Sequence, residues 1–592
     1  MKTQTATKKK DMDVQAAPSG RALVTVEKGA NESAKSTASP FGIWSDLVDY
    51  QIDAWQRGVL FWDTLRQRAD NMLDHEKAGM PPPLAFKYET VLDARTFKRP
   101  SNYALLKILE TDEDCLEDCL DPAKPPVIIV DPRAGHGPGI GGFKRESEVG
   151  IAMHEGHPVY FVMFYPDPQP HQTISDVLDS LKVFVEKVSK LHDGKKPVLY
   201  GNCQAGWLIA LLSAHCEGLV PGLAVMNGSP LSYWASGDKG ASAMQIRGSL
   251  SGGVWLTRFM ADLGGGVLNG AWLVQNFETL SPAHAVWEKL YNLYAHADTE
   301  QERFLEFERW WNGYYRFSEE EITATVENLF IGNKLEHGEM TLDEDCHVDL
   351  KDIKNPLLIF ASEGDDLTPP RQALHWIRAV YSDTKALKAA GQRIVYMINK
   401  HVGHLGIFVS AKVARLEHRA ILEQAKHIAA LKPGLYEMVI DNPTGDPDCS
   451  HDQYKVSFEE RRIEDLCDIV PQAPFEAVRQ VSERNDELYR DFVRPWVQAF
   501  AKFQNGDTLR QMHPLRLKRI MFSERLNPAM LPLIFMAKVV QENRHKASED
   551  NPYIKAERQT GEYITAALES KTALRDRQDE AIFKTLYGRN GG

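Results

Sequence analysis

Short apolar runs alternate with helical segments through the middle of the chain. The runs are rich in β-branched and aromatic residues and are bounded by turn residues, which is typical of buried strands. Apolar residues recur at helical spacing between several of them, most clearly over residues 173–192. This alternation predicts an α/β fold with a mostly parallel sheet covered by helices on both faces. The predicted strands are residues 102–108, 126–131, 158–164, 197–202, 222–227, 356–360 and 393–399.

The N-terminal part of the chain follows a different pattern. Residues 1–40 carry few large apolar side chains, so we expect a disordered tail there. Residues 41–99 open with apolar and aromatic residues at helical spacing, which predicts an N-terminal helical region. We expect its aromatic stripe to be a packing face, and the helix to end before the prolines at 81–83. The stripe consists of Trp44, Leu47, Tyr50, Ile52, Trp55, Val59, Phe61, Trp62 and Leu65.

The last two predicted strands come only after a long interval. At 592 residues the chain is too long for one compact core. We therefore expect a core formed by residues 100–230 and 351–430, with residues 231–350 inserted as a cap over the active-site end of the sheet. Residues 431–592 are charged and read mostly as helix, which predicts a C-terminal helical extension.

Composition excludes several classes of protein. The net charge of −13, without a long basic stripe, argues against a general nucleic-acid binder. No apolar run approaches the roughly 20 residues that a transmembrane helix needs. The N-terminal lysines are followed by no apolar segment, so we expect no secretory signal and a cytoplasmic location.

The seven cysteines are odd in number and irregularly spaced. This usage fits a reducing compartment better than a disulfide framework. Cys115 and Cys119 lie in the acidic run TDEDCLEDCL without a matching second pair, so a surface turn is favoured over a zinc site there. We expect no metal.

One strand-to-helix corner carries a cysteine at its centre. Residues 195–212 read KKPVLYGNCQAGWLIALL, which is an apolar strand, a Gly-x-Cys-x-Ala-Gly corner and an apolar helix. This is the layout of a nucleophile elbow, where small residues flank a nucleophile held in a strained turn. Cys203 is therefore a candidate nucleophile, and a buried cysteine acting as a small hydrophobe is the alternative. Ala205 adds one methyl group where glycine is commoner.

Two later strands are followed by residues that could complete a catalytic triad. Asp365 follows one predicted strand and His404 the next, so nucleophile, acid and base occur in the order typical of an α/β-hydrolase fold. Each alone is a weak signal, since Asp365 could cap a helix and His404 is one of nineteen histidines. The three in order favour a Cys–His–Asp triad, with Asp366 as a rival acid and His401 as a rival base.

A glycine-rich loop follows an early strand. Residues 137–142, GPGIGG, formally match GxGxxG, but the internal proline and the lack of a clear downstream partner argue against a dinucleotide site. In a hydrolase-like sheet this loop lies beside the nucleophile. We therefore expect backbone N–H groups near His136 and Gly137 to join that of Gln204 in holding an oxyanion.

Together these motifs resemble those of the polyhydroxyalkanoate synthases, most closely the catalytic subunit of the two-subunit class. GNCQAG is similar to that family's Gly-x-Cys-Gln-Gly-Gly elbow except at Ala205. DDLTPP and GHLGIFVS are similar to its acid and histidine motifs, which places the acid at Asp365 and the base at His404. The resemblance covers roughly residues 100–425, includes the cap segment at 309–342, and indicates a synthase-like bacterial branch.

The resemblance implies an acyltransferase that takes a 3-hydroxyacyl group from coenzyme A, with the thioester as substrate and no cofactor. Water or a small alcohol as acceptor would instead make the protein a thioesterase or a small-acceptor acyltransferase. A third hypothesis is a non-catalytic, granule-associated scaffold, whose terminal helices bind a partner or a hydrophobic surface. A homo-oligomer and a polymer granule surface are expected partners, and the acyl chain length stays open.

Overall fold

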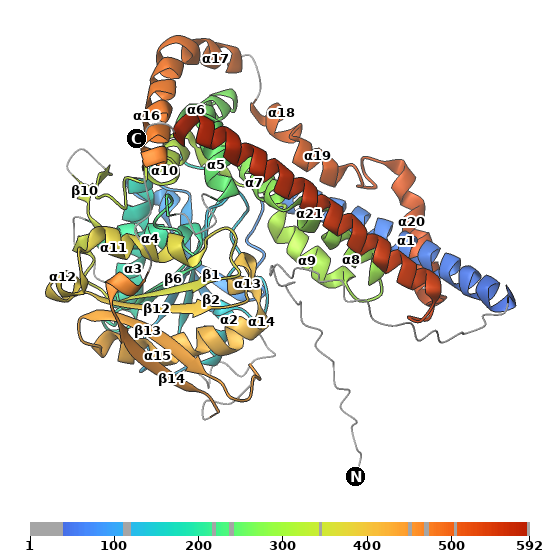
Figure 1. Cartoon of the computed structure of the whole chain (residues 1–592), viewed down its shortest axis with the longest axis horizontal. Coiled ribbons are helices and arrows are strands. Elements are labelled where there is room, and N and C mark those ends of the chain that lie inside the picture. The colour runs from blue at the N-terminus through green and yellow to red at the C-terminus, as the bar shows by residue number, and fades with distance from the viewer. Residues whose placement is uncertain are drawn as a thin grey trace.

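The computed structural model describes residues 40–109, 120–215, 221–235, 242–342, 346–447, 453–466, 473–502 and 506–588. At its centre is a ten-stranded sheet with the order β1-β2-β4-β3-β5-β6-β11-β12-β13-β14 (Figure 1). The strands are β1 Lys87–Asp93, β2 Tyr103–Leu109, β3 Val127–Val130, β4 Val159–Phe164, β5 Val198–Asn202, β6 Ala224–Asn227, β11 Leu357–Ser362, β12 Arg393–Asn399, β13 Gly434–Asp441 and β14 Lys455–Arg461.

The seven central strands of this sheet run parallel, from β4 through β3, β5, β6, β11 and β12 to β13. Antiparallel strands complete both edges. Strands β3 to β6 and β11 are buried along their whole length, which explains why each reads as an unbroken apolar run and not as an alternating one. The predicted α/β fold class and all seven predicted strands are confirmed.

Helices cover the two faces of the sheet. On one face pack α3 Ile174–Leu191, α4 Gln204–Ala214 and α11 Pro370–Val380, and on the other α2 Glu148–His154 and α15 Arg419–Ala430. Helix α3 was predicted at 173–192 and begins with a capping box between Thr173 and Asp176. The remaining short elements of this body are η1 Ala94–Thr96, α12 Thr384–Ala389, α13 His404–Val409, α14 Ala411–Val413, η5 Ala414–His418 and η6 Ile463–Asp465.

The long interval between β6 and β11 folds mainly into helices. Its helical elements are α5 Ala243–Leu250, α6 Val254–Leu263, α7 Ala271–Leu280, η2 Ala283–Glu288, α8 Lys289–Ala295, α9 Gln301–Trp311, α10 Glu319–Thr325, η3 Val326–Phe330 and η4 Leu350–Asp352. Two small two-stranded sheets join them, β7 Val267–Asn269 with β8 Arg316–Ser318 and β9 Met340–Thr341 with β10 His347–Val348. We call residues 242–342 the cap.

The two chain ends form a helical arm that extends away from the sheet. Figure 1 shows α1 Pro40–Lys77 running beside α20 and α21, with α8 and α9 of the cap against them. The C-terminal helices are α16 Ala473–Leu488, η7 Tyr489–Val493, α17 Arg494–Ala501, α18 Gly506–Gln511, α19 Pro514–Ile520, η8 Pro528–Met530, α20 Leu531–Glu542 and α21 Pro552–Tyr587.

Three features differ from the sequence prediction. Strands β1, β13 and β14 were not predicted, because their exposed faces are polar and hide the apolar alternation. The aromatic stripe of α1 is only partly a packing face, since Val59 and Leu65 are buried whereas Trp44 and Trp55 are exposed. Cys346 is disulfide-bonded, which departs from the expected reduced cysteines, while Cys203 is a free thiol.

Membrane-spanning helices, metal-binding clusters and the N-terminal tail were also considered in the sequence. Within the described part of the chain no helix is long and apolar enough to cross a membrane, and no cluster of three or more metal-binding side chains occurs there. The predicted tail up to residue 39, and both Cys115 and Cys119, lie outside the described residues.

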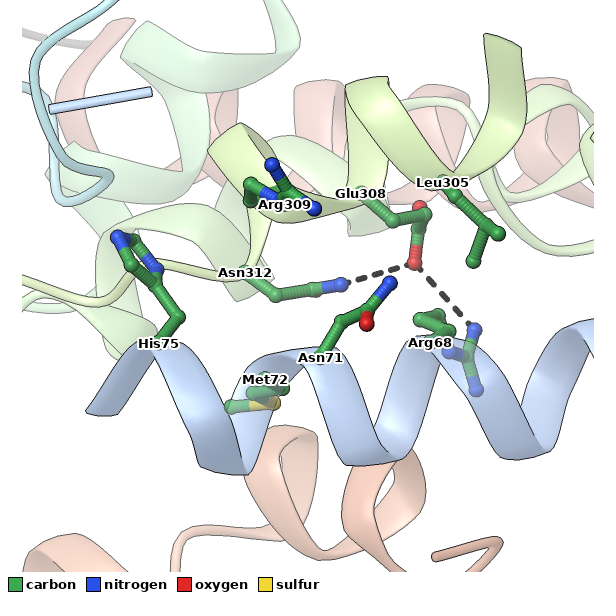
Figure 2. Close-up of a pocket in the computed structure, with 8 residues that line it drawn as sticks. All are labelled: Arg68, Asn71, Met72, His75, Leu305, Glu308, Arg309 and Asn312. Atoms are coloured by element: carbon green, nitrogen blue, oxygen red, sulfur yellow. Dashed lines mark hydrogen bonds and ion pairs between the residues drawn. The ribbon is translucent and has the colours of Figure 1, made fainter. Parts of the chain in front are cut away.

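A buried ion cluster joins the arm to the cap. The carboxylate of Glu308 on α9 is fully buried and lies 2.7 Å from Lys289 Nζ, 3.3 Å from Arg68 of α1 and 3.8 Å from Arg519 of α19. Burial alone would raise the pKa of Glu308, but these three cations hold it well below its usual range. Figure 2 shows Glu308 between Arg68 and Asn312.

The pocket drawn in Figure 2 lies between α1 and α9 and has a volume of about 10 Å³. That is the space of about one water molecule, so the pocket is too small for a metabolite. The Nε atom of Arg68 is buried beside it without a hydrogen-bond partner in the described structure. A single water molecule bound to Arg68 would satisfy this atom.

Candidate active site

The strand-to-helix corner at Cys203 is strained. Strand β5 ends at Asn202 and α4 begins at Gln204, so Cys203 alone makes the turn, with φ 47° and ψ −114°. A non-glycine residue with positive φ is uncommon, and such strain concentrates at functional sites. The N–H group of Cys203 donates to the carbonyl of Asn227 at the end of β6, 2.8 Å away, which holds the corner in place.

Two glycines permit this corner, and Ala205 does not disturb it. A Cβ atom on Gly201 would lie 2.7 Å from the carbonyl oxygen of Ala205, and one on Gly206 would lie 1.8 Å from Ser229 Oγ. The backbone therefore requires glycine at both positions. The methyl group of Ala205 instead packs into the hydrophobic core, so the departure noted in the motif is accommodated.

The structure brings Cys203, His404 and Asp365 into contact. His404 Nε2 lies 3.2 Å from Cys203 Sγ, and His404 Nδ1 lies 2.7 Å from Asp365 Oδ2. The other carboxylate oxygen of Asp365 accepts hydrogen bonds from the N–H groups of Leu367 and Thr368, both at 2.8 Å. These bonds fix the carboxylate so that Oδ2 faces the imidazole ring.

The surroundings of His404 favour its charged form. Burial alone would lower the pKa of His404, but the carboxylate of Asp365 and the charge of Cys203 raise it well above the ordinary value. The ring is held at its edge by Phe408, with ring centroids 5.2 Å apart. An imidazolium beside the sulfur atom stabilises a thiolate, the reactive form of cysteine.

The rival residues lie elsewhere. Asp366 and His401 are both exposed, whereas Asp365 is buried and His404 nearly so. Asp365 lies in the turn after β11, and His404 heads α13 after β12. Because β5, β6, β11 and β12 are successive parallel strands of the sheet, the carboxyl ends of β11 and β12 reach the same edge as Cys203.

The glycine-rich loop binds a carboxylate of the protein itself. Asp131, which follows β3, accepts hydrogen bonds from the backbone N–H groups of Gly139, Ile140 and Gly141. The N–H groups of the loop are therefore directed at a carboxyl group of the protein itself. Burial raises the pKa of Asp131 to about 7, although these hydrogen bonds oppose the shift.

His136 and Gly137 lie in the same loop, beside the strand that carries Cys203. The carbonyl of Gly137 accepts from the indole N–H of Trp310, 3.0 Å away, and lies 3.0 Å from His136 Nδ1. A Cβ atom on Gly137 would lie 2.3 Å from the ring of Tyr315, so only glycine fits. Burial lowers the pKa of His136 to about 4, with the nearby His404 adding to the effect, so its ring is neutral.

A buried polar cluster beneath the corner was not predicted. Glu148, at the start of α2, accepts hydrogen bonds from Asn202 Nδ2 at 2.5 Å and Asn227 Nδ2 at 3.1 Å. It also lies 3.5 Å from His418 Nε2. The two asparagines end strands β5 and β6 beside Cys203, so the cluster ties both strand ends together. The sequence signal that could have indicated this cluster is the asparagine that ends each of the two apolar strands, β5 and β6.

This cluster makes stability depend on pH. Burial raises the pKa of Glu148 from 4.5 to about 8, with Asp131 adding to the shift. Between these values the folded chain keeps a proton that the unfolded chain has lost. The contribution of Glu148 to the free energy of unfolding therefore falls as pH rises from about 4.5 to 8, by about 1.4 kcal/mol per pH unit, and levels off above pH 8.

Glu148→Gln is expected to remove this contribution. Denaturant unfolding between pH 5 and 8 should show a shallower fall for the variant, by about 1.4 kcal/mol per pH unit. Glu146→Gln, which changes an exposed acid on the same loop, is the matched control and should keep the slope of the parent protein. Equal slopes for all three proteins would contradict a protonated Glu148.

The cap closes over the corner. The Tyr233 hydroxyl donates to Gln204 Oε1 at 3.2 Å, and its backbone N–H donates to Asn333 of the cap at 3.2 Å. The rings of Trp310 and Trp311 pack on His136. The Cys203 residue and the His404 side chain are each only 9% exposed. A large substrate can reach the sulfur only if residues around it move.

A central parallel sheet with a strained cysteine corner after β5, an aspartate after β11 and a histidine after β12 is the layout of the α/β-hydrolase fold. The chain belongs to the family described as "Protein of unknown function (DUF3141)", which matches residues 53–591. An uncharacterised protein in the ackA 5′ region of Rhizobium meliloti is 41% identical over 556 residues, which cover 92% of this chain and 75% of that protein. Neither description mentions a polyhydroxyalkanoate synthase.

Solved structures resemble this chain only distantly. A monoacylglycerol lipase from Paleococcus ferrophilus is 14% identical, with a TM-score of 0.31, over 52% of this chain and 96% of the lipase. A thermophilic esterase from Thermogutta terrifontis is 10% identical, with a TM-score of 0.32, over 58% of this chain and 99% of the esterase. Similarity at this level gives no argument about chemistry, which has to come from the site.

Proposed function

We propose that the protein is an acyltransferase that uses Cys203 to take an acyl group from a coenzyme A thioester. The observation that carries the proposal is the continuous relay from Cys203 Sγ through His404 to Asp365 at a strained strand-to-helix corner. A thiol nucleophile suits this donor, because exchange between two thioesters changes little in free energy and keeps the acyl group activated. A serine nucleophile would instead hold the acyl group as an ordinary ester.

In the first half of the proposed cycle, His404 Nε2 holds the proton of the Cys203 thiol and the thiolate attacks the thioester carbonyl carbon. The carbon–sulfur bond to coenzyme A then breaks, and the leaving thiolate takes the proton from His404. Asp365 orients the ring and stabilises its positive form. The products of this step are free coenzyme A and acyl-Cys203.

Backbone N–H groups would stabilise the tetrahedral oxyanion in each half of the cycle. The N–H of Gln204 stands at the first turn of α4, where a helix leaves such groups without an intrahelical partner and carries a partial positive charge. The amides near His136 and Gly137 would supply the second donor from the loop after β3.

In the second half, His404 removes a proton from the acceptor, whose oxygen attacks the carbonyl carbon of acyl-Cys203. The carbon–sulfur bond to Cys203 then breaks, and the leaving thiolate takes the proton back from His404. A 3-hydroxyacyl acceptor gives an ester and makes the protein similar to a polyhydroxyalkanoate synthase, whereas water gives a free acid and makes it a thioesterase. The low exposure of Cys203 and His404 favours transfer, because a closed site protects the acyl-enzyme from hydrolysis.

Incubation with 3-hydroxybutyryl-coenzyme A tests the proposal. We expect release of free coenzyme A, an acyl adduct on the peptide that contains Cys203, and an ester-linked product. Free acid without ester would favour the thioesterase. Absence of both adduct and thiol release with every acyl-coenzyme A tried would contradict the enzyme and favour a scaffold.

A further inference from the structure

The helices α16 and α17, joined by the π-helical turn η7, expose apolar side chains around their junction. Leu488, Phe492, Trp496 and Phe500 follow one another at four-residue spacing along it. All four are exposed, Phe492 to 69% and Trp496 to 77%. The same segment is attached to the cap, where Arg494 pairs with Asp262 and Glu319, so it is not frayed or loosely held.

Two further helices expose apolar side chains in the same way. On α20 Leu531, Ile534, Phe535 and Val539 are exposed at helical spacing, and Lys538 lies on the same face. On α19 and the turn after it Leu517 and Met521 are exposed, with Lys518 beside them. Figure 1 shows α17, α18, α19 and α20 following one another along one edge of the molecule. We call residues 488–502 and 506–539 the outer arch.

The charge of this stretch differs from that of the rest of the chain. Residues 488–539 contain nine Lys and Arg but only three Asp and Glu, in a chain with a net charge of −13. Several of its arginines bind acids of α1, such as Arg516 with Glu76 and Arg525 with Asp74. Lys518 and Lys538 make no ion pair within the described residues, so their charge is available to a partner.

We propose that the outer arch docks on an anionic lipid surface and lies in its headgroup region. Exposed Trp, Phe, Leu and Met side chains with lysines at their border are the pattern of interfacial helices. Anionic headgroups complement the two unpaired lysines, and these side chains can extend to the headgroups while the apolar face enters the lipid. No described helix could span the bilayer, so the association is peripheral.

A second copy of the chain fits this surface less well. In a symmetric dimer the same patch faces itself, which would bring the unpaired Lys518 and Lys538 of one copy toward those of the other. Protein interfaces are also depleted in lysine, whereas Lys518 and Lys538 adjoin the most apolar parts of α19 and α20. The acids of α1 beside the arch, Glu76 and Asp74, are already paired with Arg516 and Arg525. Negative charges beyond about 10 Å are screened at moderate salt, so they do not cancel the attraction of the two lysines.

Vesicle flotation with the full chain tests the proposal. We expect binding to vesicles of phosphatidylcholine mixed with phosphatidylglycerol, weaker binding to phosphatidylcholine alone, and loss of the difference at high salt. Lys518→Gln and Lys538→Gln should each weaken binding about fivefold. Phe492→Ser together with Trp496→Ser should weaken it tenfold or more, roughly the effect of withdrawing one aromatic side chain from lipid.

Matched controls lie on the body of the protein. Val183→Ser removes an exposed apolar side chain from α3, and Lys426→Gln removes an exposed lysine from α15. Both control variants should bind the vesicles as the parent protein does. Circular dichroism of each variant tests whether it is folded. Equal loss in controls and arch variants, no flotation with phosphatidylglycerol, or light scattering that shows a dimer broken by Phe492→Ser and Trp496→Ser would each overturn the proposal.

Discussion

Cys203→Ala is expected to abolish release of coenzyme A from acyl-coenzyme A substrates, with a fall in kcat on the order of 10⁴- to 10⁶-fold. The variant keeps the corner but has no atom that can accept the acyl group, so neither transfer nor hydrolysis through acyl-Cys203 can occur. Thiol release and the mass of the Cys203 peptide measure the two consequences separately. Undiminished release in the variant would end the assignment of Cys203 as nucleophile.

The relay offers its own matched controls. His404→Ala and Asp365→Asn should each lower kcat by on the order of 10³-fold or more, because they remove the base or leave its ring unsupported. His401→Ala and Asp366→Asn change exposed neighbours and should leave kcat within a few-fold of the parent. A loss in either control as large as in its partner would mean that the wrong acid or base has been chosen.

Glu308→Ala is expected to lower the free energy of unfolding by about 3–5 kcal/mol. It would leave Lys289, Arg68 and Arg519 buried around a site without its negative charge. Removal of one partner from a buried ion cluster is costly, because Lys289 and Arg68 would lose their counter-ion without regaining water, while Arg519 would keep Glu278 as a counter-ion. The change would act at the junction of α1, α9 and α19, so the arm should separate from the cap first.

Denaturant unfolding and limited proteolysis measure this effect. Glu306→Ala, on the same helix but exposed, is the matched control and should change stability by no more than about 0.5 kcal/mol. Faster cleavage within the arm is expected in Glu308→Ala alone. A variant as stable as the control would show that the cluster contributes little to holding the arm.

Much of the sheet could be predicted because its strands are buried on both faces. An unbroken apolar run bounded by turn residues is a strong signal for a strand, and this pattern predicted β2 to β6, β11 and β12. Strands β1, β13 and β14 escaped because one of their faces meets water and carries charged residues, as in KVSFEER of β14. Their pairing depends on a neighbouring strand that no local pattern identifies.

The relay was also predictable, since a parallel sheet brings the carboxyl ends of its strands to one edge and Cys203, Asp365 and His404 each follow a strand. The local sequence pattern distinguished Asp365 and His404 from their neighbours Asp366 and His401 only weakly. The turn after β11 buries Asp365 and exposes its neighbour, and that difference arises from hydrogen bonds to Leu367 and Thr368.

By itself the sequence determined the α/β class, the strained corner with its glycines, and the order of Cys203, Asp365 and His404. Each strand and each corner is recognised from residues adjacent along the chain, and each of the three residues follows such a strand. Only the tertiary structure decided that Glu148 lies beneath the corner, that the glycine-rich loop binds Asp131, and that Trp44 and Trp496 face outward. Burial and long-range contact set these features. A helical stripe looks the same in sequence whether it meets a core or solvent, and only the packing of distant segments distinguishes the two.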